Sequence, residues 1–307
     1  MNDIFEKHFK EQGFTEPTLI QKEVYPLLAQ GKDVLGLSPT GSGKTLAYAL
    51  PLLEKVLKGD GPQLLIIAPS QELAAQLADV IRPWGKLLEI KTAAIIGGAN
   101  VKRQIEKLRK DRPEVIVGTP GRLLNLADEK RLKLHNLEAI VIDEADEMLA
   151  QEETLADCRK LVSRAKADVQ LGFFSATKTP VLNELHKWFG IEPITCDVRK
   201  QDQTRGHVTH YMVEVPQRKR VEALRKLANV KDFYALVFFK QNAELKDAYE
   251  KLIHAGASVA RLSSVGSTEV VEIAVLASTI CTSTWLDWSG GWVSTSWGVV
   301  FGVGVSV

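Results

Sequence analysis

Short apolar runs alternate with longer helix-like stretches through the first two hundred residues of the chain. The runs are four or five residues long and end at glycine or polar residues, which is typical of buried strands. The runs expected to form strands cover residues 33–37, 64–68, 93–96, 114–117, 139–142 and 170–174. Strands that alternate with helices predict an α/β fold, a parallel sheet with helices on both of its faces.

Helices are expected between these strands. One begins near Pro17 with Thr15 or Thr18 as its N-cap, because proline is tolerated in the first turn of a helix. Two more are expected over residues 71–80 and 101–110. In a parallel sheet, ligands gather at the carboxyl ends of the strands. The glycine-rich and polar segments that directly follow the apolar runs are therefore the candidate functional positions.

Residues 38–45 read Ser-Pro-Thr-Gly-Ser-Gly-Lys-Thr and lie between an expected strand and a helix-like run at residues 46–50. Glycine lets the backbone curl so that successive N–H groups point at anionic oxygens, and the following helix adds its positive end. Lys44 is placed to reach the phosphates of a nucleotide, and the Thr45 hydroxyl to bind Mg²⁺. The strict pattern has glycine where Ser38 stands. The alternative is a Gly-Ser turn before a surface helix.

A second chemical centre follows residues 139–142, where the sequence reads Asp143-Glu144-Ala145-Asp146. A carboxylate at the end of a strand can hold Mg²⁺ beside phosphates that a glycine loop binds. Asp143 is therefore the candidate metal ligand, and Glu144 is placed to orient or deprotonate an attacking water. The alternative is an acidic helix N-terminus, which the helix dipole favours. The phosphate loop upstream in the same chain favours the metal interpretation.

Gln21 is a candidate adenine contact. Its side chain offers amide donors and a carbonyl acceptor, the two functions that are needed to read an adenine edge. Alone this is a weak pattern, and the alternative is a surface glutamine on a helix. A nucleotide site elsewhere in the chain gives the adenine interpretation its support.

The chain has 307 residues, 45% hydrophobic and 25% charged, the composition of a soluble globular protein long enough for two domains. Its cysteines, Cys158, Cys196 and Cys281, lack metal-ligand spacing and suggest a reducing compartment, not a disulfide framework. The N-terminus is charged too early for a secretory signal, so a cytoplasmic protein is expected. Residues 1–261 carry 39 basic and 35 acidic side chains, a weakly basic balance that is compatible with nucleic acid.

Taken together, these motifs resemble those of the DEAD-box ATP-dependent RNA helicases. The matching segments are Gly13-Phe14, Pro17-Thr18 and Gln21, then residues 40–45, Pro69 with Glu72-Leu73-Ala74 and Gln76, then Gly97-Gly98, residues 119–122, residues 143–146 and Ser175-Ala176-Thr177. So many motifs in the family's order make the resemblance specific over residues 1 to 200. It implies a RecA-like parallel sheet in a first domain at residues 1–197, with ATP and Mg²⁺ as cofactors.

The resemblance also implies a role for each matching residue. Nucleotide contacts are implied for Phe14, Thr18, Gln21, Thr40, Gly41, Ser42, Gly43, Lys44 and Thr45, with Thr45 and Asp143 on the metal. Catalysis, or coupling of the nucleotide state to domain movement, is implied for Lys44, Asp143, Glu144, Ser175 and Thr177. Contacts to the RNA backbone are implied for Pro69, Gly97, Gly98, Thr119, Pro120, Gly121 and Arg122. Loop N–H groups, a hydroxyl and a guanidinium suit such contacts, which carry no base sequence.

At two positions, Ser38 and Gln71, this sequence departs from an expected motif. Ser38 breaks the strict phosphate-loop pattern, although the family usually has alanine rather than glycine there. Gln71 stands where the family usually has arginine, so a charged group with bidentate capacity is missing. The change at Gln71 either weakens the RNA contact, alters packing or is a harmless lineage difference.

Residues 198–206 are polar and lack periodic apolar positions, which predicts a linker. The segment after it resembles the opening half of the family's second RecA-like domain, a partial domain at residues 207–262. Within it, strands are expected at residues 210–215, 235–239 and 259–262, and helices at 217–227 and 244–254.

Residues 263–307 form an atypical tail that has no lysine or arginine and holds four of the six tryptophans. In the family, this region supplies arginines that reach the γ-phosphate, a role worth about 10³–10⁵ in rate in related systems. Three interpretations compete for the tail. It is a membrane anchor at residues 288–307, or strands that complete the sheet, or the product of a reading frame lost after about Ser264. The abrupt loss of basic residues favours the lost frame.

Two functional hypotheses follow from the motifs. The first is an ATP-dependent RNA helicase, which couples ATP binding and hydrolysis to RNA binding and local duplex unwinding. The second is an ATP- and RNA-binding module without turnover, because the finger arginines are missing. RNA is the expected partner in both, held through its backbone with little sequence specificity, and no membrane partner is expected. A DNA-directed motor is disfavoured, because the Gln21 and Asp143-Glu144 motifs resemble those of the RNA family.

Overall fold

The computed structural model describes residues 2–97, 106, 108–202, 214–230, 234–239, 241–257, 259–262 and 272–277. The chain divides into two compact units, Met1–Arg205 and Gly206–Val307. Val198, the first residue of the predicted linker, is buried in the first unit, and its N–H donates to the Leu37 carbonyl oxygen at 2.9 Å. The packed part of the first unit therefore continues beyond Asp197, where the sequence pattern placed its end.

The first unit is built on one seven-stranded sheet in which every pairing is parallel. Its strands are β1 (Val34–Leu37), β2 (Leu64–Ile67), β3 (Thr92–Ile95), β4 (Val115–Gly118), β5 (Ala139–Ile142), β6 (Gln170–Ser175) and β7 (Ile194–Asp197). Their order across the sheet is β3-β4-β2-β5-β6-β1-β7. The first six confirm the strands expected from the apolar runs. The edge strand β7 was not predicted, because three of its four residues are exposed and it has no apolar run.

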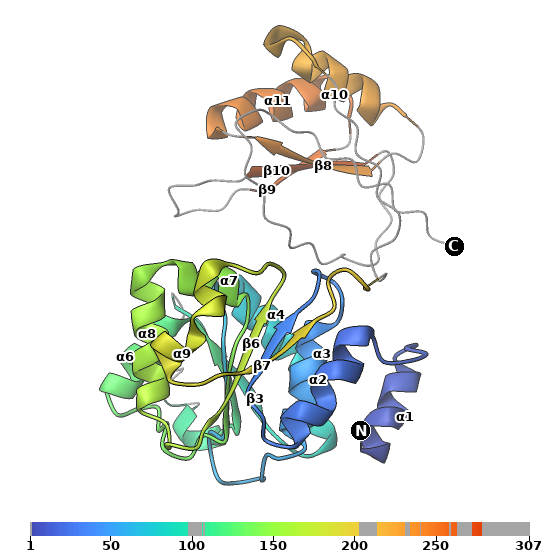
Figure 1. The fold of residues 1–307 in the computed structure, drawn as a ribbon. Helices are drawn as coiled ribbons and strands as arrows, with labels where there is room; N and C mark the ends of the chain where they lie inside the picture. Colours follow the sequence, from blue (N-terminus) through green and yellow to red (C-terminus); the bar gives the residue numbers. More distant parts are fainter. Residues whose placement is uncertain are drawn as a thin grey trace. The chain divides into compact units, whose positions relative to one another are not determined.

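Alternate side chains of the strands point into two separate cores, one on each face of the sheet. Val34 and Ile66 belong to the first core, and Leu35 and Ile67 to the second. The first core is covered by α1 (Asp3–Glu11), α2 (Leu19–Ala29), α3 (Lys44–Leu53) and α4 (Gln71–Leu87), and the second by α6 (Pro120–Asp128), α7 (Ala145–Ala150), α8 (Glu152–Ser163) and α9 (Leu185–Phe189) (Figure 1). Burial on both faces explains why the strands read as continuous apolar runs. The predicted α/β fold is confirmed.

The structure selects one of the two predicted caps of α2 and departs from the sequence prediction at two other helices. Thr18 is the N-cap of α2, so the alternative cap at Thr15 is wrong. The helix α4 continues past the predicted end at residue 80, because Ile81 and Trp84 extend its buried stripe. The helix α6, which was not predicted, begins directly after β4 with Pro120 at its first position, where proline is favoured.

The second unit contains a three-stranded sheet with the order β8-β10-β9. Its elements are a 3-10 turn η2 (Gln217–Lys219), α10 (Arg220–Ala228), β8 (Tyr234–Phe239), α11 (Asn242–His254), β9 (Val259–Leu262) and β10 (Glu272–Ala277). Two helices and two strands lie at the predicted positions. The strand β10 belongs to the tail and pairs antiparallel with both neighbours. Strands that complete the sheet, one of the three interpretations of the tail, account for this segment.

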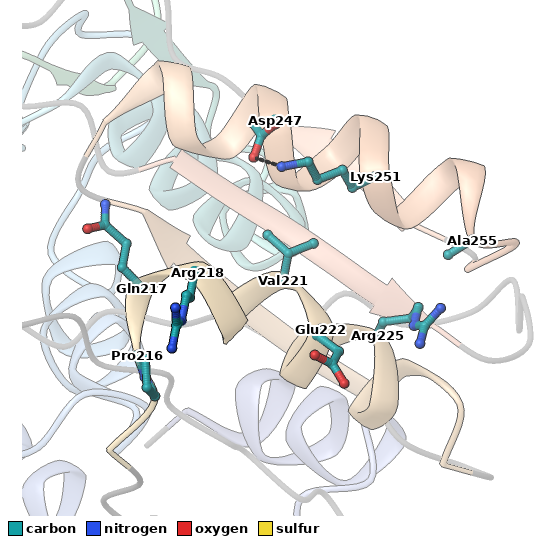
Figure 2. Close-up of a pocket in the computed structure, with 9 residues that line it drawn as sticks. All are labelled: Pro216, Gln217, Arg218, Val221, Glu222, Arg225, Asp247, Lys251 and Ala255. Carbon is teal, nitrogen blue, oxygen red and sulfur yellow. Dashed lines mark hydrogen bonds and ion pairs between the residues drawn. The ribbon is translucent and has the colours of Figure 1, made fainter.

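A groove of about 1020 Å³ lies along α10 and α11 of the second unit (Figure 2). Its lining is Pro216, Gln217, Arg218, Val221, Glu222, Arg225, Asp247, Lys251 and Ala255. Within it, Lys251 Nζ lies 2.7 Å from Asp247 Oδ2. None of the residues singled out by the sequence lines this groove, so the candidate site is built from the first unit.

Some predicted features lie largely outside the described residues. They are the helix at 101–110, Gly98, the strand at 210–215 and the segment 288–307. Within the described part of the chain, no helix combines the length and the apolar character that crossing a membrane requires.

Candidate functional site

The strand order sorts the sequence motifs into two groups along the carboxyl edge of the sheet. The strands β5, β6 and β1 are neighbours in the sheet. Asp143 follows β5, Ser175 ends β6, and the glycine loop follows β1. The neighbouring strands β3, β4 and β2 lead into Gly97, Thr119 and Pro69. The sheet topology therefore brings together motifs that are far apart in the sequence, with the predicted nucleotide residues in one half and the predicted RNA residues in the other.

The glycine loop turns from the end of β1 into α3. Gly41 and Gly43 have φ angles of 79° and 86°, in the left-handed region that favours glycine. A Cβ on Gly41 would meet no atom within 4 Å, so the loop leaves space there. Gly43 is the N-cap of α3, which places the positive end of the helix dipole at the loop. The alternative of an ordinary turn before a surface helix is wrong, because α3 is buried along most of its length.

Two buried serines and a lysine fix the loop from inside. The hydroxyls of Ser38 and Ser42 lie 2.7 Å apart, and neither residue is exposed. The Lys44 ammonium donates to the carbonyl oxygens of Ser38 at 3.1 Å and Pro39 at 3.4 Å. Ser38 therefore has a structural use, because neither glycine nor alanine could bond to the Ser42 hydroxyl.

Gln21 reaches the same loop from α2. Its Nε2 donates to the Gly43 carbonyl oxygen at 3.2 Å, and its Oε1 accepts from the Thr18 N–H at 3.0 Å. Only 6% of the residue is exposed, so the alternative of a surface glutamine is wrong. Each of the two amide functions keeps one further hydrogen-bonding position. The adenine contact stays a prediction, and the structure adds a second task, which is to tie α2 to the phosphate loop.

Gly43→Ala is expected to damage the loop for two reasons. A left-handed φ of 86° costs an alanine about 1–2 kcal/mol, and the new Cβ would lie 2.6 Å from Gln21 Nε2. Relief of this strain and of the clash would move the loop N–H groups that are expected to bind phosphate, so we expect the affinity for a fluorescent ATP analogue to fall by about tenfold or more. Gly59→Ala is the matched control, because Gly59 has a φ of 95° but no neighbour within 4 Å. Unchanged affinity in Gly43→Ala would contradict the role given to the loop.

Asp143 is buried at the end of β5, and the protein holds both of its carboxylate oxygens. Oδ2 accepts from the Tyr48 hydroxyl at 2.9 Å, and Oδ1 accepts from the Glu144 N–H at 3.0 Å. Burial raises the pKa of Asp143, while the charge of Lys44 and the Tyr48 hydrogen bond oppose the rise. A buried carboxylate that is oriented on both sides and lies near an ammonium group suits a divalent cation beside phosphates.

Glu144 follows with a left-handed backbone, φ 45° and ψ 50°, which is uncommon for a residue other than glycine. Such strain persists at functional sites where the surrounding structure enforces it. Burial raises the pKa of Glu144 to about 7, with Lys44 opposing the rise and Asp143 adding to it. A carboxylate with a pKa near 7 is matched to proton transfer at neutral pH.

Ser175 and Thr177 connect the glycine loop to the acidic segment. The Ser38 N–H donates to the Ser175 carbonyl oxygen at 3.2 Å. The Ser175 hydroxyl donates to the Thr177 carbonyl oxygen at 2.5 Å and accepts from the Thr177 N–H at 3.1 Å. The Thr177 hydroxyl donates to the Asp146 carboxylate. The Ser175–Thr177 segment is therefore hydrogen-bonded to the glycine loop on one side and to the acidic segment on the other.

The residues of this half of the sheet edge fit a nucleotide phosphate with Mg²⁺. Lys44 supplies a cation, Asp143 a buried carboxylate, and Thr45 a hydroxyl in the first turn of α3. Mg²⁺ in proteins is bound by one or two carboxylates together with phosphates of the substrate. The open space at Gly41 lies at the N-terminus of a helix, where backbone N–H groups bind anions.

Phe14, for which the resemblance implies a nucleotide contact, packs at the edge of an aromatic cluster. Its ring centroid lies 4.8 Å from that of Phe9, and 45% of Phe14 is exposed. Phe9 and Phe5 both lie on α1, and both rings face Trp84 of α4. The ring centroids of Phe9 and Trp84 are 6.3 Å apart, and those of Phe5 and Trp84 are 5.8 Å apart. The helix α1 was not predicted, although the four-residue spacing of Phe5 and Phe9 was an available signal.

The other half of the edge carries the predicted RNA residues that the structure describes, Pro69, Gly97, Thr119, Pro120, Gly121 and Arg122. Thr119 is the N-cap of α6. Ser70 is the N-cap of α4, and its hydroxyl accepts from the Leu73 N–H at 3.1 Å. Two helix N-termini thus begin at neighbouring strand ends, an arrangement that favours anions such as phosphates.

Gln71, in the first turn of α4, packs against Gly97. A Cβ on Gly97 would lie 2.7 Å from Gln71 Nε2. Gly97 follows β3 and Gln71 follows β2, so this contact joins two strand ends of the predicted RNA half of the edge. The three alternatives for the departure at Gln71 remain open, and the residue brings no positive charge to the edge.

Gln71→Arg is expected to strengthen binding to single-stranded RNA at low salt. One added phosphate contact steepens the slope of log affinity against log salt by about 0.7. The measurement is a salt series of RNA binding by fluorescence anisotropy. Gln30→Arg is the matched control, because Gln30 is exposed at the end of α2, before β1, on the opposite edge of the sheet. If the slope of log affinity against log salt were the same for Gln71→Arg and Gln30→Arg, position 71 would not contact the RNA.

Comparison with known proteins gives a consistent result. Residues 18–185 match the DEAD/DEAH box helicase family. The chain is 39% identical over 254 residues to the probable ATP-dependent RNA helicase YfmL of Bacillus subtilis, which covers 82% of this chain and 66% of that protein. It is 34% identical over 278 residues to the DEAD-box ATP-dependent RNA helicase CshC of Bacillus cereus, which covers 90% of this chain and 71% of that protein.

Solved structures of similar proteins show the same fold. A DEAD box protein from the hyperthermophile Methanococcus jannaschii aligns with a TM-score of 0.59 and 33% identity, over 83% of this chain and 69% of that one. Dbp5 of S. cerevisiae, bound to RNA and ADP BeF3, aligns with a TM-score of 0.69 and 26% identity, over 83% of this chain and 66% of that one. The chain thus spans between 66% and 71% of the length of these four proteins.

Proposed function

This chain belongs to the DEAD/DEAH box helicase family, and we propose that it couples ATP binding and hydrolysis to RNA binding and local unwinding of RNA duplexes. The observation that carries the proposal is the edge of the sheet. There β5, β6 and β1 bring Asp143, Ser175 and the glycine loop together, and β3, β4 and β2 place Gly97, Thr119 and Pro69 alongside.

The nucleotide half of the edge divides the work among few residues. Lys44 and the N–H groups of the glycine loop bind phosphate oxygens, and Gln21 keeps the loop attached to α2. Bound Mg²⁺ would neutralise charge on the phosphates, with Asp143 and Thr45 as its protein ligands. Glu144 orients the attacking water and accepts its proton. Thr177 joins the segment after β6 to the acidic segment after β5 through Asp146.

The RNA half of the edge binds the backbone of RNA. Thr119, Gly121 and Gly97 supply a hydroxyl and main-chain groups beside two helix N-termini. Contacts of this kind position RNA without reading its bases. Free thiols at Cys158 and Cys196 support a proposed cytoplasmic location.

A second candidate function is binding of ATP and RNA without turnover. One observation favours it, which is that residues 262–307, a region where the resemblance places γ-phosphate arginines, contain no lysine or arginine. Arginines that reach the γ-phosphate contribute about 10³–10⁵ in rate in related phosphoryl-transfer systems. The two candidates share the binding site and differ only in catalysis.

Strand displacement tests the proposal. A short labelled RNA duplex with a single-stranded overhang is incubated with the protein and ATP, with ADP in a parallel reaction. Separation of the strands with ATP and not with ADP supports the helicase. Binding of both ATP and RNA without separation would support the binding module, and absence of RNA binding would overturn both.

A further inference from the structure

Tyr48 is buried beside Asp143, one of the two residues that are proposed to bind Mg²⁺. It lies on α3, one turn after Lys44, and none of it is exposed. Its hydroxyl donates to Asp143 Oδ2 at 2.9 Å. Its ring packs on Phe174 of β6, with the centroids 4.8 Å apart. Tyr48 therefore links α3, β5 and β6 at one point beneath the glycine loop.

The Tyr48 hydroxyl completes the hydrogen bonding of the Asp143 carboxylate. Oδ1 is held by the Glu144 N–H at 3.0 Å, and the main-chain N–H of Asp143 donates to the Ile67 carbonyl oxygen at 3.0 Å. An ionised carboxylate accepts about four hydrogen bonds or metal contacts in all. Two positions are used by the protein, so lone pairs remain for a cation or its water ligands.

We propose that Tyr48 is a positioning residue, which holds the carboxylate of Asp143 in the orientation that Mg²⁺ requires. The inference rests on the proposed nucleotide site. A phenylalanine would fill the same space against Phe174, so packing alone does not account for the hydroxyl. A buried tyrosine hydroxyl needs a hydrogen-bond partner. Here the partner is Asp143, a proposed metal ligand.

Groups that orient metal ligands usually contribute about 10–100-fold to metal affinity. Without the hydroxyl, Asp143 keeps one of its two hydrogen bonds, and its carboxylate is free to rotate about χ2. Mg²⁺ would then have to order its own ligand, which lowers its apparent affinity. The lysine and the loop N–H groups are untouched, so binding of the phosphates without Mg²⁺ stays as it is.

The test compares Tyr48→Phe with Tyr25→Phe. The Tyr25 hydroxyl also donates to a carboxylate, Glu54, at 2.5 Å, but on the exposed side of α2 and away from the glycine loop. The binding of a fluorescent ADP analogue is titrated at a series of Mg²⁺ concentrations and in excess EDTA. For Tyr48→Phe we expect the Mg²⁺ concentration at half-maximal enhancement to rise about tenfold, with unchanged affinity in EDTA. Tyr25→Phe should match the parent chain in both.

Each affinity with Mg²⁺ is divided by the affinity of the same protein in EDTA, so a lower folded fraction cancels from the ratio. An unchanged or stronger Mg²⁺ dependence in Tyr48→Phe would overturn the proposal, as would an equal change in Tyr25→Phe. Failure of the parent chain to bind the analogue would instead overturn the proposed nucleotide site. As a second check, the Mg²⁺ dependence of analogue binding is compared in an Asp143→Asn background. There it should be the same whether position 48 is tyrosine or phenylalanine.

Discussion

Lys44→Ala is expected to reduce ATP binding and hydrolysis by about 100-fold or more. Lys44 is the cation of the glycine loop, and its ammonium already lies within 3.4 Å of two loop carbonyl oxygens. A fixed positive group at a transferred phosphoryl contributes several kcal/mol, because it acts in a site from which water is excluded. Only 7% of Lys44 is exposed, so its charge is little screened by solvent.

The control for this variant is Lys58→Ala. Lys58 is an exposed lysine of the same domain, and it pairs with Glu89 on the surface. Nucleotide affinity is measured by titration calorimetry, and turnover by phosphate release. Lys58→Ala should behave as the parent chain in both. Full binding and turnover in Lys44→Ala would mean that the phosphates lie elsewhere.

Glu144→Gln is expected to leave ATP binding intact and to lower RNA-stimulated turnover by about 10²–10⁴-fold. The amide has the shape of the carboxylate, and the left-handed backbone at this position is unaffected by the change. An amide oxygen is too weak a base to accept the proton of the attacking water. The loss therefore appears in kcat and not in the affinity for the nucleotide.

Glu147→Gln provides the comparison for that variant. Glu147 is an exposed acid of the same helix, α7, and it makes none of the site's hydrogen bonds described above. Its turnover should equal that of the parent chain. If Glu144→Gln hydrolysed ATP at the parent rate, the water-activating role would have to move to another residue.

The sheet and the edge that carries the candidate site were predictable from sequence because both depend on local pattern. Strands buried on two faces read as unbroken apolar runs, and β5 lies at residues 139–142 as expected. The residue after such a run then lies at the carboxyl edge, which located Asp143, Ser175 and Thr119. The edge strand β7 has no such run and was missed.

The contacts within the site were not predictable, because they join residues that are distant in the sequence. Tyr48 reads as one more apolar position of α3, and only the fold shows that its hydroxyl meets Asp143. Gln21 suggested adenine, whereas its bond to the Gly43 carbonyl oxygen depends on how α2 packs beside the loop. In the sequence, Gln71 shows only that the arginine usual in the family is absent. Its contact with Gly97 depends on the strand order, which the sequence does not show.

ATP hydrolysis by this 307-residue chain, with and without single-stranded RNA, tests the account most directly. The account predicts phosphate release that RNA stimulates and that Lys44→Ala abolishes. Binding of ATP without release would leave the nucleotide site in place and favour the module without turnover. A chain that binds no nucleotide at any Mg²⁺ concentration would contradict the central claim that the edge formed by β1, β5 and β6 is an ATP site.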